Sequence, residues 1–195
     1  MTDQSDAGQG HDPLKRRRLL EAAAAEFARV GFDRANLDTI TRTAGVAKGT
    51  AYLYFPSKAA LFVAVLEELR RRLESAIPAT DSATGADATL RSFIRAHLAL
   101  ADEIPDLFRC YTSALFGVNR EFQGAARSTF AWQTQMLRDL LATKHGRRAG
   151  RRMREQATLL AGSILAAALV RDLSGRVDGN TALEEEALLA MAASL

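Results

Sequence analysis

Apolar residues recur along this chain at the spacing of one helical face, and no segment alternates convincingly as a strand would. The first apolar stripe consists of Leu19, Leu20, Ala23, Ala24, Phe27 and Val30. A second stripe runs from Lys58 to about Ala76, and later helices are expected over residues 87–102, 104–115, 119–144, 150–173 and 181–194. With two short helices between the stripes, the pattern predicts an all-α protein of about nine helices.

Between the two stripes lies the segment NLDTITRTAGVAKGTAYLYFPSK, residues 36–58. Gly45 follows a short apolar-periodic run and supplies the left-handed residue that ends a helix. Lys48 to Tyr54 is too short to be stable alone, so packing through Ala51 and Phe55 must hold it. Pro56 ends this helix, and Ser57 is a suitable N-cap for the next one. The layout predicts a helix-turn-helix.

Two lysines stand where helix electrostatics disfavour them. Lys48 and Lys58 each lie in the first turn of a helix, beside the positive end of its dipole. Phosphates would account for both positions, because helix N-termini with added lysines attract anions and duplex DNA presents anions in a row. The alternative is that both lysines are simply solvated.

The residues of this region closely resemble the TetR family of bacterial transcriptional regulators. The match covers about residues 16–62, RRRLLEAAAAEFARVGFDRANLDTITRTAGVAKGTAYLYFPSKAALF, and GVAKGTAYLYFPSK is its most specific part. The resemblance implies that Lys48, Gly49, Thr50, Tyr52 and Tyr54 face the major groove or its phosphates, and that Lys58 binds the DNA backbone. Asn36 and Arg16 complete the expected DNA-binding set. Family members are typically homodimeric repressors that a small ligand releases from DNA.

Three departures from the family pattern bear on the operator sequence. Ala47 stands where relatives often carry a serine or threonine, so the recognition helix lacks a side-chain cap. Asp38 stands where arginine is frequent, and an acid there would repel phosphate or accept from a cytosine amino group. Thr41 and Ala51 fill positions that are more often Ala and Leu.

Charge is distributed unevenly along the chain. The whole chain has a formal net charge of +3, whereas residues 13–58 hold nine basic and four acidic residues and so carry +5. A basic N-terminal part on a near-neutral remainder fits a DNA-binding head, and by itself would also fit a helix on a membrane surface. The start of the chain is polar with no apolar core of a signal peptide, so we expect a cytoplasmic protein that does not enter a membrane.

Residues 157–170, ATLLAGSILAAALV, are apolar nearly all round but too few to span a bilayer. They must be buried in protein, either in the core of one chain or in a four-helix interface between two copies. Relatives pair through their last helices, which favours the homodimer. The expected dimerisation residues are Leu159, Gly162, Ala166, Leu169, Leu188 and Met191.

Large side chains on the middle helices are candidates for an apolar effector pocket with a few polar anchors. They are Phe93, His97, Phe108, Tyr111, Phe116, Trp132 and Met136. Each of them is equally compatible with an ordinary core position. Cys110 is the only cysteine, so no intrachain disulfide can form, and it is either a redox sensor or a small buried hydrophobe.

We therefore expect a tail over residues 1–12, a DNA-binding domain over 13–58, a connecting helix over 58–76 and an effector-binding and dimerisation domain over 77–195. The predicted function is a repressor that a small apolar or amphipathic effector releases from a palindromic operator. The alternative is a regulator without a ligand, controlled by a protein partner or by abundance. Scattered histidines and the absence of metal-spaced or nucleophile motifs argue against an enzyme, a metal site or a cofactor.

Overall fold

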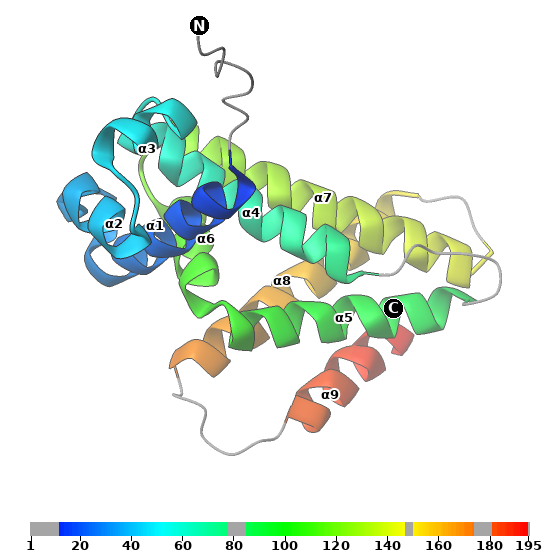
Figure 1. Cartoon of the computed structure of the whole chain (residues 1–195). Coiled ribbons are helices and arrows are strands. Elements are labelled where there is room, and N and C mark those ends of the chain that lie inside the picture. Colours follow the sequence, from blue (N-terminus) through cyan, green and yellow to red (C-terminus); the bar gives the residue numbers. More distant parts are fainter. Residues whose placement is uncertain (1–11, 78–84, 147–149, 174–180, 195) are drawn as a thin grey trace, which may run out of the picture. The chain divides into compact units, whose positions relative to one another are not determined.

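The computed structural model describes residues 12–77, 85–146, 150–173 and 181–194, and every regular element in these ranges is an α-helix (Figure 1). The helices are α1 (Pro13–Arg34), α2 (Leu37–Ala44), α3 (Lys48–Tyr54), α4 (Lys58–Ala76), α5 (Gly85–Glu103), α6 (Pro105–Phe116), α7 (Arg120–Lys144), α8 (Arg151–Leu173) and α9 (Thr181–Ser194). The all-α prediction is confirmed. The expected tail, apart from Asp12, lies outside the described residues.

Close contacts divide the chain into two compact units, Met1–Val65 and Leu66–Leu195. We call the first unit the head and the second the body. The boundary falls inside α4, so the first turns of this helix belong to the head and the remainder belongs to the body.

The first helix of the head begins at a capped proline and bends at a glycine. Asp12 caps α1 by accepting a hydrogen bond from the Leu14 N–H at 2.9 Å, and Pro13 follows at the first helical position. At Gly31 the backbone leaves the helix, with φ 77° and ψ 164°, a conformation that a side chain would disfavour. The Ala35 N–H then bonds to the Gly31 carbonyl at 3.1 Å and closes one more turn. Gly31 therefore marks a kink, after which α1 continues to Arg34.

An aromatic cluster and an aliphatic layer form the core of the head. Phe27, Phe32 and Phe62 meet with ring centroids 4.9–5.9 Å apart, two of the three pairs edge to face. Leu19 and Ile40 are fully buried beside them. α1 packs on α2 and α2 on α3, so the long first helix supports α2, and α2 in turn supports α3.

In the body, α5, α7 and α8 pack on one another, α6 packs on α5 and α7, and α9 packs on α5 and α8 (Figure 1). Their shared core includes Phe93, Ile94, Leu98, Leu137, Leu160 and Ile164. Ion pairs join helices at the edge of this core. Arg95 on α5 binds Glu185 on α9 at 2.7 Å, and Arg109 on α6 binds Asp172 on α8 at 2.6 Å.

No single helix within the described ranges combines the length and hydropathy of a membrane span, although α3 and α4 together, bent by 60°, reach those values.

Candidate nucleic-acid interface and interior cavity

The turn between α2 and α3 has the geometry that its sequence predicts. Asn36 caps α2 by accepting from the Asp38 N–H at 2.8 Å. Gly45 adopts φ 63° and ψ 35°, the left-handed conformation expected of a helix-ending glycine. The next N–H, that of Val46, bonds back to the Thr41 carbonyl at 3.0 Å, and the Val46 side chain is buried. The chain therefore reverses tightly between two short helices.

The helix that follows the turn is anchored on one side and open on the other. Ala51 and the adjoining Phe55 are buried, whereas Tyr52 is 46% exposed and Leu53 is 66% exposed. Lys48 and Gly49 are exposed and Thr50 and Tyr54 are half-buried. As the sequence suggests, Ala47 provides no side-chain cap for α3. The exposed Leu53 was not among the predicted contacts, because a leucine in a helix usually indicates core.

Lys48 has an acidic neighbour on this open side. Its ammonium lies 2.7 Å from the carboxylate of Asp38 in the first turn of α2, and both side chains are more than half exposed. The hydrogen bond with Asp38 raises the pKa of Lys48. The structure thus supplies an intramolecular anion at the position for which the sequence suggested a phosphate.

Lys58 also has partners within the head. Its ammonium donates to the backbone carbonyls of Asp33 and Ala35, each at 3.1 Å, and lies 4.6 Å from the centre of the Phe32 ring. Carbonyls at the end of a helix have no helical partners, so a cation satisfies them well. Two of the three ammonium hydrogens are thus bonded within the head.

Three of the other predicted DNA contacts, Arg16, Tyr54 and Asn36, also make interactions within the head. The guanidinium of the exposed Arg16 lies 5.6 Å from the Phe55 ring centre, and the Tyr54 hydroxyl donates to the Asp12 carbonyl at 3.2 Å. The backbone N–H of Asn36 binds the buried Glu26 carboxylate, whose pKa is lowered mainly by its hydrogen bond from Arg29 and further by this contact. Each residue therefore helps to hold the head together.

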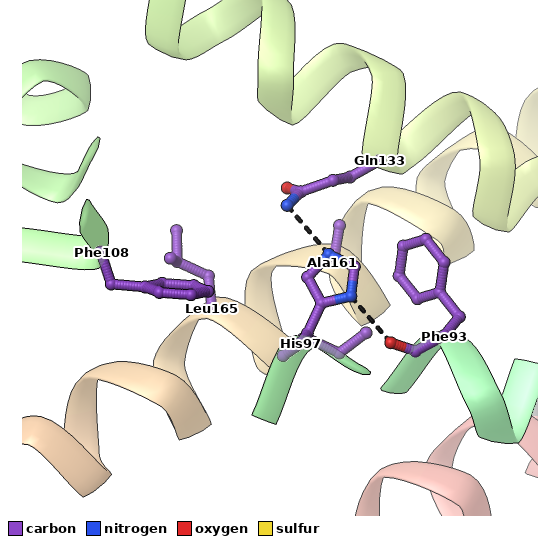
Figure 2. Close-up of a pocket in the computed structure, with 7 residues that line it drawn as sticks. Phe93, His97, Phe108, Gln133, Ala161 and Leu165 are labelled. Carbon is purple, nitrogen blue, oxygen red and sulfur yellow. Dashed lines mark hydrogen bonds between the residues drawn. The ribbon is translucent and has the colours of Figure 1, made fainter. Parts of the chain in front are cut away.

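The body contains a small cavity among α5, α6, α7 and α8, drawn in Figure 2. Its lining consists of Phe93, His97, Phe108, Gln133, Ala161, Ile164 and Leu165. The volume of the cavity that is open to the centre of a water molecule is about 10 Å³, close to what a single water needs. The lining contains no acidic residue, lysine or arginine. Its polar side chains are those of His97 and Gln133.

His97 is held by a chain of hydrogen bonds (Figure 2). Its Nδ1 lies 2.8 Å from the Phe93 carbonyl, and its Nε2 lies 3.0 Å from the Gln133 side-chain nitrogen. Burial lowers the pKa of His97 to about 4, so the ring is neutral at pH 7. Because a carbonyl can only accept, Nδ1 carries the proton and Nε2 accepts from the Gln133 amide.

Three of the seven predicted pocket residues line this cavity: Phe93, His97 and Phe108. Trp132 and Met136 are half-buried elsewhere, with the Arg70 guanidinium 5.7 Å from the Trp132 ring centre. Phe116 is 75% exposed and Tyr111 is fully buried away from the lining. Gln133 was missed, although a signal exists: it shares the apolar stripe of α7 with Ala126 and Leu137.

The apolar segment of α8 has one buried face and one that is exposed or half-buried. Ala157, Leu160, Ala161, Ile164 and Ala168 face the core of the body. On the other side, Leu159 is 64% and Val170 54% exposed, Ala166 is exposed, and Gly162 and Leu169 are half-buried. On α9, Leu188 is buried and Met191 is half-buried. One face of α8 is therefore buried in the core of this chain, and the other is exposed and could be covered by a second copy.

Cys110 lies on α6 and does not line the cavity. The thiol is buried, and burial raises its pKa to about 12, so the reactive thiolate is suppressed at neutral pH. In the described ranges no three His, Cys, Asp or Glu side chains gather as metal ligands would.

Residues 19–65 match the sequence profile described as "Bacterial regulatory proteins, tetR family". The HTH-type transcriptional regulator RutR of Escherichia coli K12 is 31% identical over 97 residues, covering 50% of this chain and 46% of RutR. The uncharacterized HTH-type transcriptional regulator YvdT of Bacillus subtilis is 44% identical over 55 residues, 28% of each chain. The matched part thus spans about half or less of these relatives.

Solved structures resemble nearly the whole chain. A TetR-like transcriptional regulator from Rhodococcus sp. RHA1 superimposes with a TM-score of 0.76 at 23% identity, covering 94% of this chain and 96% of that one. The regulator FadR of Bacillus subtilis, solved in complex with stearoyl-CoA, has a TM-score of 0.72 at 22% identity and covers 92% and 98%. At these identities the likeness shows the fold.

Proposed function

We propose that this chain, whose residues 19–65 match the TetR family of bacterial regulatory proteins, is a homodimeric repressor that a small molecule releases from operator DNA. The observation that carries the proposal is the open side of α3, where Tyr52 and Lys48 face solvent on a helix anchored through Ala51. A short helix held in this way can enter a major groove without unfolding its support. Because such a regulator works at the chromosome, we place it in the cytoplasm.

The DNA-binding residues that we propose are those of the open side together with its flanks. Lys48, Gly49, Thr50, Tyr52 and Tyr54 would meet base edges or nearby phosphates, and Asn36, Arg16 and Lys58 would meet the backbone. Leu53 joins this set because its exposure suits contact with a thymine methyl group. The DNA-binding domain would cover residues 13–58, with α4 leading to an effector-binding and dimerisation domain over 77–195.

Dimerisation is supported by the outer face of α8. Leu159 and Val170 are large and exposed, and the smaller Gly162 and Ala166 between them would allow another helix to approach closely. A second copy would cover this face with its own α8, and α9 would add Met191 and the edge of Leu188. Two-fold pairing would set two recognition helices at successive major grooves, about 34–36 Å apart, on a palindromic operator.

The effector site that we propose is the cavity of the body. Its lining is apolar apart from the neutral His97 and the Gln133 amide, so a buried charge on a ligand would have no partner there. An uncharged apolar molecule, or the apolar part of an amphipathic one, suits this lining; the similarly folded FadR of Bacillus subtilis was solved in complex with stearoyl-CoA. The cavity is close to the size of one water, so such a molecule would have to displace lining side chains. That displacement would couple binding to conformation.

The coupling must be reciprocal. If the effector lowers affinity for the operator by some factor, operator DNA lowers affinity for the effector by the same factor. The test begins with a duplex selected from a random pool by the purified protein, and measures its anisotropy with and without a panel of apolar and amphipathic metabolites. Salt-dependent binding that one compound reverses supports the proposal, and failure to bind any duplex overturns it.

The alternative is a regulator without a ligand, controlled by a protein partner or by abundance. The observation that favours this alternative is the small volume of the cavity, which is close to that of one water molecule. Duplex binding that no compound alters, together with a melting temperature that no compound raises, would support this alternative.

A further inference from the structure

Asp38 is an exposed acid in a head whose residues 13–58 carry a formal net charge of +5. The pair that it forms with Lys48 joins the first turn of α2 to the first turn of α3, with 2.7 Å between the carboxylate and the ammonium. Asn36 is the N-cap of α2 and accepts from the Asp38 N–H. The Asp38 carboxylate accepts instead from the lysine of the recognition helix. This arrangement has a consequence for DNA binding.

A phosphate that approaches Lys48 meets the carboxylate as well. It must either displace Asp38 or settle beside a like charge, and both options weaken the contact. This cost falls on every duplex, because phosphates are present at every position. A cytosine amino group is different, since it can donate to a carboxylate. A duplex that presents cytosine at this point would recover what other duplexes lose.

Resting on the proposed function, we propose that Asp38 is a specificity-determining residue that acts through Lys48. By holding the ammonium, it lowers affinity for arbitrary DNA more than affinity for the operator. The ratio of the two affinities therefore depends on a residue that itself makes the surface less attractive to DNA.

The test compares Asp38→Asn with the wild-type chain on two duplexes, one random and one selected by the protein. We expect Asp38→Asn to bind the random duplex about two- to fivefold more tightly, the range of an exposed ion pair. The salt dependence should steepen by about 0.9 in the slope of log K against log salt, as for one added phosphate contact. Affinity for the selected duplex should rise less or fall, so that the specificity ratio decreases.

Two further variants control this comparison. Asp33→Asn removes the same charge from an exposed aspartate of the head whose carboxylate makes no ion pair among the described residues, and it should change random-duplex affinity less. Lys48→Ala tests the route: if Asp38 acts through Lys48, then Asp38→Asn should have no further effect in a Lys48→Ala background. Melting curves of all variants check that the head stays folded.

Three results would overturn the inference. They are an effect of Asp38→Asn equal to that of Asp33→Asn, an equal gain on both duplexes, or a gain that persists without Lys48. In each of these cases the wild-type protein still binds DNA, and the proposed function stands. If the wild-type protein binds no duplex, the proposed function itself fails.

Discussion

The head and the body arrange their polar groups in opposite ways. On the open side of the head, Lys48 and Asp38 form a charged pair in contact with water, each more than half exposed. In the body cavity, His97 and Gln133 form an uncharged pair that is buried. Exposed charges act over a distance and respond to salt, whereas an enclosed neutral pair responds to whatever displaces it. The two regions thus suit a charged polymer and an uncharged small molecule.

The largest expected effect concerns the enclosed pair. His97 has a pKa of about 4 in the folded chain and an ordinary value near 6.5 when unfolded. Its contribution to stability is therefore complete above pH 6.5 and is lost as the pH falls toward 4, because the unfolded chain binds a proton that the folded chain refuses. The loss is on the order of 3 kcal/mol.

Urea unfolding at pH 7 and pH 4.5 measures this loss. His97→Gln, which cannot titrate, should show a smaller drop in the free energy of unfolding than the wild-type chain. His145→Gln, at an exposed position on the C-cap of α7, serves as the control and should behave as wild type. An identical pH dependence in all three proteins would show that folding does not lower the pKa of His97, and the contrast with the head would be lost.

The next effect concerns the open side of the head. Tyr52→Ala should weaken binding to the selected duplex by about 1–3 kcal/mol, the range for a base-contacting side chain. Its melting temperature should stay close to wild type, because the side chain is 46% exposed. Anisotropy and circular dichroism measure the two quantities. An unfolded Tyr52→Ala head would mean that Tyr52 belongs to the core and that the wrong face has been assigned to DNA.

A smaller effect distinguishes the two lysines of the head. Lys58→Met should destabilise the head by about 1–2 kcal/mol, because two carbonyls and the Phe32 ring lose their cation. Lys48→Met removes only an exposed ion pair and should cost less than about 1 kcal/mol. Thermal unfolding compares them. Equal stability of both variants would restore the interpretation of Lys58 as a lysine kept only for phosphate.

The smallest effect concerns Tyr111. Its hydroxyl is buried and has no hydrogen-bond partner in the described part of the chain, and burial raises its pKa. Tyr111→Phe should therefore leave stability unchanged or raise it by up to about 1 kcal/mol. Tyr54→Phe is the matched control, since it loses a bond to the Asp12 carbonyl and should lower stability slightly. A clear loss in Tyr111→Phe would reveal a partner for that hydroxyl.

The local signals of the sequence predict the head well, because they are properties of single residues. Gly45 has to take a left-handed conformation, Ser57 has to cap the next helix, and the structure shows both, with the Ala60 N–H 3.0 Å from the Ser57 hydroxyl. Helix bounds in the body follow equally well from apolar spacing. The partners of Lys48 and Lys58 could not be predicted, since they depend on how α1, α2 and α3 pack.

The cavity shows the same limit more strongly. Phe93 and His97 share a face of α5 at a spacing that the sequence reveals. Gln133, Ala161 and Leu165 come from α7 and α8 and meet them only after the body has folded. Choosing large aromatic residues favoured Trp132 and Phe116, whereas the side chains beside His97 include small and aliphatic ones. The DNA contacts, the dimer face and the effector pocket all stay predictions.

In α3 the buried residues and the outward-facing residues are different ones, which bears on how the operator preference of such a protein can change. The residues that attach the helix, Ala51 and Phe55, are separate from those that face outward, and Ala47 makes no side-chain cap to the helix. We expect that positions 48, 49, 50, 52 and 53 can be varied together while the head stays folded. If α3 contacts DNA as proposed, selection for new operator preferences would act on these positions of the seven-residue helix.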